Sequence, residues 1–118
     1  MKTTLSFLSL FILMVISGCI GLAPKNEHEI YAKEINHQNY QCKNDTIIHA
    51  TYYSLSDNSL GFVKLTLPDN HEVTLAQAIS ASGARYSNGL LTWWIKGSSG
   101  FFQSQNQSNN CQSQLNPP

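Results

Sequence analysis

Hydrophobic and polar residues alternate through the middle of the chain with the period of two that is typical of β-strands. In GFVKLTL, residues 61–67, an aliphatic side chain occupies every second position from Val63 onward. Segments 46–54, 71–75 and 90–96 are rich in β-branched and aromatic residues and also predict strands. Turn-forming sequences lie between these segments: SDNS at 56–59, PDN at 68–70 and SNG at 87–89.

The remaining segments are shorter or more polar. Strands around Cys42 and at 101–105 bring the prediction to about six to eight short strands without a convincing helix. This pattern predicts an all-β fold, a small antiparallel barrel or sandwich. The polar run 103–118 predicts coil, apart from whatever pairing holds its cysteine. Residues 19–38 predict a flexible tether, with a short helix at 27–35 as a weaker alternative.

The N-terminus has the features of an export signal. A lysine at position 2 precedes an apolar run at 5–16 that is too short for a comfortable membrane span. The next residues, ISGC, resemble a bacterial lipobox, which implies that residues 1–18 are a lipoprotein signal peptide and that Cys19 is lipidated. The alternative is an ordinary secreted protein whose signal contains a cysteine. Because Ile20 rather than an aspartate follows the cysteine, the outer membrane is the favoured destination.

The cysteine count supports this interpretation. The chain has three cysteines, and an exported protein with an odd number leaves one unpaired. If Cys19 carries lipid, Cys42 and Cys111 remain as a pair that brackets most of the mature chain. A disulfide across so long a loop stabilises the fold by about 4 kcal/mol on the chain-entropy model. Two distant cysteines without close ligand spacing do not predict a zinc site.

Charge and candidate chemistry argue against several classes of function. Lysine plus arginine equals aspartate plus glutamate, so the chain lacks the basic character of a nucleic-acid binder. Ser82, His71 and Asp69 are the residues from which a catalytic triad would have to be built, but their spacing does not resemble a nucleophile elbow. The sequence has no phosphate loop, cofactor fingerprint or metal-ligand spacing. We therefore expect a protein that is not an enzyme and needs neither cofactor nor metal.

Strand alternation divides segment 90–96 into two faces. Leu91, Trp93 and Ile95 share one face, which is expected to pack in the core. Trp94 and Lys96 then project from the other face, where a lysine at a strand end is ordinarily a solubilising residue. By the same local criteria, Ser82 and Gly83 form only a turn.

Two motifs in fixed order suggest a more specific role: SASGARY at 80–86 and WWIKG at 93–97. Together they resemble the membrane-bound inhibitors of c-type lysozyme, a family of small eight-stranded antiparallel barrels. The resemblance covers about residues 38–115, so that 39–118 form the predicted barrel domain. The residues that carry the resemblance are Ser82, Gly83 and Tyr86; Trp93, Lys96 and Gly97; and Tyr40, Cys42 and Cys111. The adjacent tryptophans depart from related sequences, which we expect to affect packing more than function.

The resemblance implies how such a protein acts. Its partner is c-type lysozyme, which cleaves peptidoglycan with two carboxyl groups in a cleft. Ser82 and Lys96 are expected to enter that cleft and pair with those groups, and Gly83 to shape the turn. Arg85, Tyr86 and Trp94 are expected to supply flanking contact area. Two other classes stay open from the residues alone: a barrel that binds a small ligand, and a structural lipoprotein of the envelope.

Overall fold

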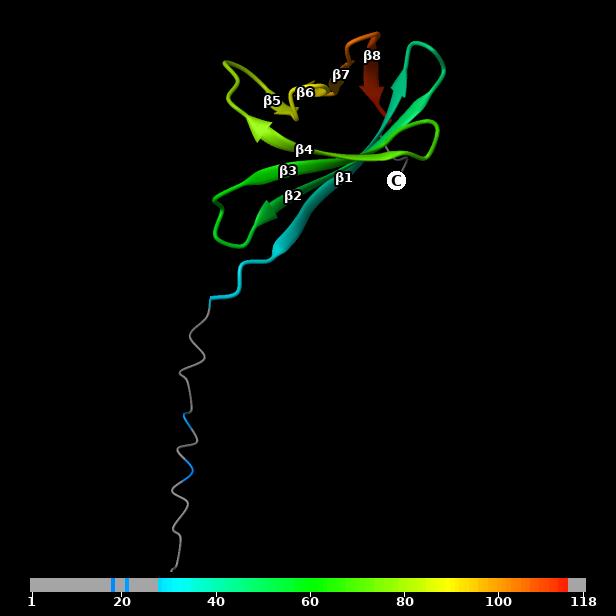
Figure 1. Ribbon diagram of the computed structural model, residues 1–118. Helices are drawn as coiled ribbons and strands as arrows, with labels where there is room; N and C mark the ends of the chain where they lie inside the picture. Colours follow the sequence, from blue (N-terminus) through cyan, green and yellow to red (C-terminus); the bar gives the residue numbers. More distant parts are fainter. Residues whose placement is uncertain (1–17, 19–20, 22–27, 115–118) are drawn as a thin grey trace, which may run out of the picture.

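The computed structural model describes Gly18, Gly21 and residues 28–114, and this part of the chain folds into one closed barrel (Figure 1). Cys19 and, except for Gly18, the predicted signal peptide lie outside the described residues. Each strand pairs antiparallel with the next, and β8 pairs with β1. The prediction of an all-β antiparallel barrel of about eight strands is confirmed. The strands are β1 Ala32–Cys42, β2 Ile47–Leu55, β3 Gly61–Thr66, β4 Glu72–Ala78, β5 Ala84–Ser87, β6 Thr92–Lys96, β7 Ser99–Gln103 and β8 Ser108–Ser113.

The core of the barrel is made of apolar and aromatic side chains, and Trp93 is fully buried among them. The indole lies so close to β7 that a Cβ at Gly100 would collide with it, so this position must lack a side chain. Trp93 Nε1 donates to the Tyr52 hydroxyl at 3.0 Å, and the Tyr40 and Tyr52 hydroxyls are hydrogen-bonded at 3.1 Å. Burial raises the pKa of these two phenols above the ordinary tyrosine value. The buried tyrosine hydroxyls are thus satisfied by one another and by the indole.

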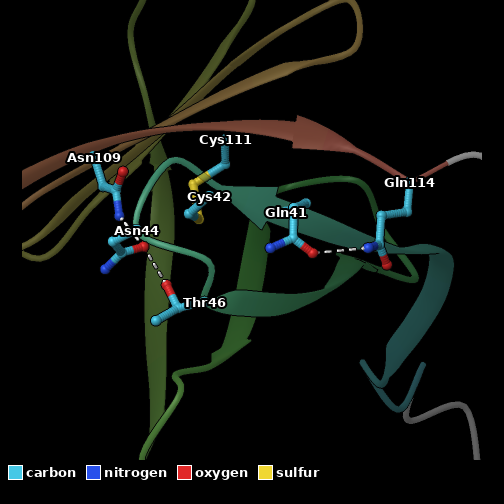
Figure 2. The surroundings of a disulfide bond; sticks show 7 residues. All are labelled: Gln41, Cys42, Asn44, Thr46, Asn109, Cys111 and Gln114. Carbon is cyan, nitrogen blue, oxygen red and sulfur yellow. Dashed lines mark hydrogen bonds between the residues drawn. A yellow bond between two sulfur atoms is a disulfide. The ribbon is translucent and has the colours of Figure 1, made fainter.

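The barrel closes where β1 meets β8, at the disulfide between Cys42 and Cys111 (Figure 2). The two cysteines are directly opposite each other in the antiparallel pair, with an S–S distance of 2.02 Å. Side-chain amides link the two strands further: Asn109 Nδ2 donates to Asn44 Oδ1 at 2.6 Å, and Gln114 Nε2 donates to Gln41 Oε1 at 3.1 Å. The predicted disulfide is confirmed, and it joins the first strand to the last.

The C-terminal polar run contains a strand where coil was predicted. Strand β8, with the sequence SNNCQS, pairs with β7 on one side and with β1 on the other. Strand propensity largely reflects how side chains pack on a half-buried sheet, so a run of serine, asparagine and glutamine carries little strand signal. Here the backbone groups are satisfied by two neighbouring ladders, and Cys111 supplies the buried side chain.

Strand β1 likewise begins earlier than the predicted boundary between tether and domain. Residues 32–38 were expected to be tether, yet from Ala32 onward they pair with β2, with a bulge between Glu34 and Asn36. The side chains of 32–37 are exposed, so no alternation of burial marks this segment as strand in the sequence. The long β2 provides the partner that holds it.

Turns between the strands follow local chemistry, with one difference in detail. At the predicted turn 68–70, Asn70 has a φ of 64° and Asp69 Oδ1 accepts from His71 N at 3.0 Å. At SNG, the hairpin forms, but only Gly89 has a positive φ, of 89°. Asn88 instead caps the loop, because its Oδ1 accepts from the backbone N–H groups of Leu90 and Leu91.

Candidate functional site

Loops alternate between the two ends of an antiparallel barrel. The β2–β3, β4–β5 and β6–β7 loops share one end, which we call the site end because the β4–β5 loop contains Ser82 and the β6–β7 loop follows Lys96. The β3–β4 loop, with Asp69 and His71, lies at the opposite end. The barrel therefore separates Ser82 from the other two residues of a hypothetical triad, which agrees with the expectation that these residues are not catalytic.

Gly83 brings the Ser82 turn against the end of β6. Its φ is +66°, in the left-handed region that disfavours residues with a side chain. A Cβ here would collide with the Ile95 carbonyl oxygen and lie 2.7 Å from Lys96 Cγ. Glycine is thus required twice, for its backbone conformation and for the close approach. In consequence Ser82 lies in the loop that packs beside Lys96.

Trp94 holds the same turn by its side chain. Its Nε1 donates to the Ser82 carbonyl oxygen at 2.9 Å, and Ser80 Oγ donates to the same oxygen at 2.5 Å. The Ser82 hydroxyl makes no hydrogen bond to any other described residue, and Ser82 is exposed. The backbone of the turn is held while its hydroxyl remains available to a partner. Trp94, which was expected to supply flanking contact area, therefore also holds the backbone of the Ser82 turn.

Lys96 is the last residue of β6 and is exposed. Its Nζ lies 4.6 Å from the centre of the Trp94 ring, a cation–π contact worth about 0.5–1 kcal/mol at an exposed position. Lys96 is paired with Ser99 across a two-residue loop in which Gly97 has a φ of 55°. Lys96 forms no salt bridge with any residue in the described part of the chain. A rigid strand thus presents an unpaired ammonium group beside the Ser82 turn.

The flanking residues divide into two groups. Arg85 lies opposite Trp94 in the β5–β6 pair, is half-buried, and shares the outer face of the barrel with it. Tyr86 lies opposite the buried Trp93 and is only 6% exposed. Its ring packs against Tyr52, and burial raises the pKa of its phenol. The expectation that Tyr86 supplies contact area is therefore wrong, because strand alternation turns it into the core.

Two residues of this region, Ser80 and Phe101, were not predicted from the sequence. Ser80 helps to hold the Ser82 carbonyl, and nothing in its local sequence indicates that role. Phe101 lies opposite Trp94 in β7 and faces outward, since its neighbour Phe102 is buried. The alternation in FFQSQ carries that signal, although it does not reveal which residue would be opposite.

Two further findings concern metal binding and membrane spanning by the described residues. Within Gly18, Gly21 and residues 28–114, no group of three or more His, Cys, Asp and Glu side chains is placed to hold a metal ion. No helix in this part of the chain is long and apolar enough to span a bilayer.

Comparison with known proteins gives the family. A family model described as the membrane-bound lysozyme-inhibitor of c-type lysozyme matches residues 40–110, more than half of the chain. The chain belongs to this family. The matched residues include the Ser82 turn and β6 with Lys96, so both features of the candidate site lie within the region that defines the membrane-bound lysozyme-inhibitor family.

Curated relatives carry the same family name. A membrane-bound lysozyme inhibitor of C-type lysozyme from Pseudomonas aeruginosa is 40% identical over 58 residues, which cover 49% of this chain and 44% of the relative. Those from Cupriavidus necator and Yersinia enterocolitica are each 32% identical, over 60% and 76% of this chain and 54% and 64% of the relatives. The chain thus spans about half to two thirds of the length of these relatives.

A solved structure supports the fold. The crystal structure of Pseudomonas aeruginosa MliC in complex with hen egg white lysozyme matches with a TM-score of 0.58 at 22% identity. The match covers 73% of this chain and 85% of that chain. At this identity the likeness establishes the family's barrel architecture for this chain.

Proposed function

We propose that this chain inhibits c-type lysozyme by inserting the Ser82 turn and Lys96 into the active-site cleft of the enzyme. The single observation that carries the proposal is the junction at Gly83, where the turn with an available hydroxyl packs against the strand end with an unpaired ammonium. Membership of the lysozyme-inhibitor family supports the same conclusion. So does the relative in the matched crystal structure, which is bound to hen egg white lysozyme.

The chemistry of the target explains why a hydroxyl and an ammonium are suitable. C-type lysozyme uses a protonated glutamic acid as general acid and an ionised aspartate as nucleophile or electrostatic stabiliser. In retaining glycosidases the two carboxyl groups lie about 5 Å apart. In the proposed complex Lys96 pairs with the aspartate and the Ser82 hydroxyl hydrogen-bonds to the other carboxyl group. The inhibitor blocks the cleft without undergoing chemistry itself, so it needs no cofactor.

The surrounding residues have supporting roles. The hydrogen bond from Trp94 holds the turn, which reduces the conformational entropy that is lost on binding, and Gly83 lets the turn pack against β6. Arg85 supplies contact area on the same outer face. Lipidation of Cys19 would anchor the inhibitor to the cell envelope, where the outer membrane is the proposed location and peptidoglycan the protected substrate.

A double-mutant cycle tests the mechanism. Hen egg white lysozyme is titrated with the full-length protein purified in mild detergent and with the S82A, K96A and S82A/K96A variants, and the inhibition constant is measured. The two single losses are expected not to add, because both groups act in one cleft. Lys64→Ala, another exposed lysine beside an aromatic ring, is the matched control. Full inhibition by the double variant would refute the mechanism, whereas no inhibition by the unaltered protein would refute the function.

A further inference from the structure

A groove of about 550 Å³ runs along the outer face of β6, β7 and β8. It begins at Lys96 and Trp94, crosses β7 at Phe101, and reaches Lys43 just after β1. Asn110 and Gln112 of β8 also line it. The groove leads away from the Ser82 turn, which is not among its lining residues.

Strand pairing sets the order of side chains in this groove. Trp94 is opposite Phe101, Phe101 is opposite Asn110, and the backbone N–H of Lys43 donates to the Asn110 carbonyl oxygen at 3.0 Å. These positions therefore form one row from β6 across β7 and β8 to the residue that follows β1. At a spacing of about 4.8 Å between strands, the row extends about 14 Å. One small anion is too short to engage both ends of such a row.

The chemistry of the row combines three kinds of group. Trp94 and Phe101 are half-buried and provide apolar ring surface. The exposed carboxamide of Asn110 can both donate and accept hydrogen bonds. That of Gln112 already donates to Ser99 Oγ at 3.1 Å and accepts from Ser98 Oγ at 3.4 Å. Lys43 and Lys96 add positive charge, and neither forms a salt bridge with a described residue. The groove lining contains no aspartate or glutamate.

We propose that this groove binds an acidic glycan. Sugar rings present apolar faces to aromatic side chains and hydroxyl or acetamido groups to carboxamides, while carboxylates on the glycan pair with the two ammonium groups. The groove shares Lys96 and Trp94 with the proposed inhibitory site, whereas Lys43 and β8 belong to the groove alone, so K43A tests glycan binding separately from the role of Ser82.

Binding of defined oligosaccharides to the full-length protein tests this inference by isothermal titration calorimetry. The probes are a disaccharide-tetrapeptide from peptidoglycan and tetragalacturonate, both of which carry carboxylates, with neutral chitotetraose as the comparison. We expect binding of at least one acidic probe, and which one binds distinguishes an envelope glycan from a generic acidic polysaccharide. We expect K43A and F101A each to weaken glycan binding by about tenfold or more, and K43A to leave lysozyme inhibition unchanged.

Matched variants on another outer face provide the controls. Lys64 and Phe62 on β3 also combine a lysine with outward aromatic rings, so K64A and F62A should leave glycan binding unchanged. Equal binding of chitotetraose, no binding of either acidic probe, or binding that survives both K43A and F101A would each overturn the proposal. Loss of lysozyme inhibition in S82A alone would concern only the proposed function and not this groove.

Discussion

Two lysines of this barrel lie over aromatic rings on its outer surface, yet only one belongs to a candidate binding site. Lys96 Nζ is 4.6 Å from the centre of the Trp94 ring, and Lys64 Nζ is 5.7 Å from that of Tyr53. Both lysine side chains are exposed, and each aromatic ring lies on the same β-sheet, near its lysine. Local chemistry alone therefore does not distinguish the two pairs.

Their positions in the barrel make the difference. Lys64 lies within β3, between Thr51 of β2 and Thr74 of β4, so regular strands surround it on both sides. Lys96 ends its strand at the site end, where the β4–β5 loop packs against it through Gly83. A charge on the side of a barrel faces solvent, whereas a charge at its end can enter a partner's cleft together with a loop. The four predictions that follow test this contrast.

Removal of each lysine in turn should show the largest contrast. Lys96→Ala is expected to weaken lysozyme inhibition by at least about 30-fold, because it leaves a carboxylate of the cleft buried without its partner. Lys64→Ala should change the inhibition constant by less than about twofold, since Lys64 lies on the side of the barrel between β2 and β4 and not at the site end. Steady-state assays with both variants check this. Equal losses would mean that general charge, and not the position at the site end, determines inhibition.

Replacing each of two glycines by alanine distinguishes the effect of a strained backbone from the effect of displacing the packed turn. Gly83→Ala adds a side chain at positive φ and against the Ile95 carbonyl, so inhibition should weaken about tenfold or more and the free energy of unfolding should fall by about 1–3 kcal/mol. Gly89→Ala also places a side chain at positive φ, but no atom lies within 4 Å of its Cβ. That variant should lose some stability and keep inhibition. Denaturant unfolding beside the inhibition assay distinguishes the two effects.

Conservative changes to the two rings should give a smaller effect. Trp94→Phe removes the hydrogen bond to the Ser82 carbonyl, worth about 0.5–1.5 kcal/mol, and should weaken inhibition about three- to tenfold. Tyr53→Phe removes a hydroxyl that forms no hydrogen bond with another described residue, and should leave inhibition unchanged. The same inhibition assay measures both. Unchanged inhibition by the Trp94 variant would show that Gly83 suffices to hold the turn.

Salt should have the smallest effect on the inhibitory site. The chain has no net charge, so long-range attraction to basic lysozyme contributes little, and a pair inside a cleft is only weakly screened. We expect the inhibition constant to change by less than about threefold between about 0.05 and 0.3 M sodium chloride. Glycan binding to the exposed lysines of the groove should weaken more steeply. A steep salt dependence of inhibition would contradict the proposed local fit.

Much of the fold could be predicted from residue patterns. Alternation at 61–67 indicated β3, and the turn at 68–70 formed as its chemistry indicated. The same alternation correctly separated the buried Trp93 from the outward Trp94 and Lys96. These predictions succeed because each strand places every second side chain in the core, and the sequence records that period directly.

Other features depended on partners that are distant in sequence. Segment 32–38 and strand β8 consist mostly of exposed polar residues, so their strand conformation comes from backbone pairing with β2, β7 and β1. Tyr86 was expected to contact the partner because it belongs to the family motif, and a motif does not report the direction of a side chain. The role of Gly83 requires the Ile95 carbonyl, which is brought near only when β5 and β6 pair.

The sequence by itself determined the strand periodicity, the turn positions and the motifs that identify the family. Tertiary structure decided which surface features become a site. Lys96 and Lys64 look alike in sequence, because each is a lysine in an apolar strand. Barrel closure places one at an end beside a hydroxyl-bearing turn and leaves the other between strands. The physical reason is that the alternation of side chains along a strand is a local property. The neighbours of a side chain across the sheet depend instead on pairing with residues that are far away in the sequence.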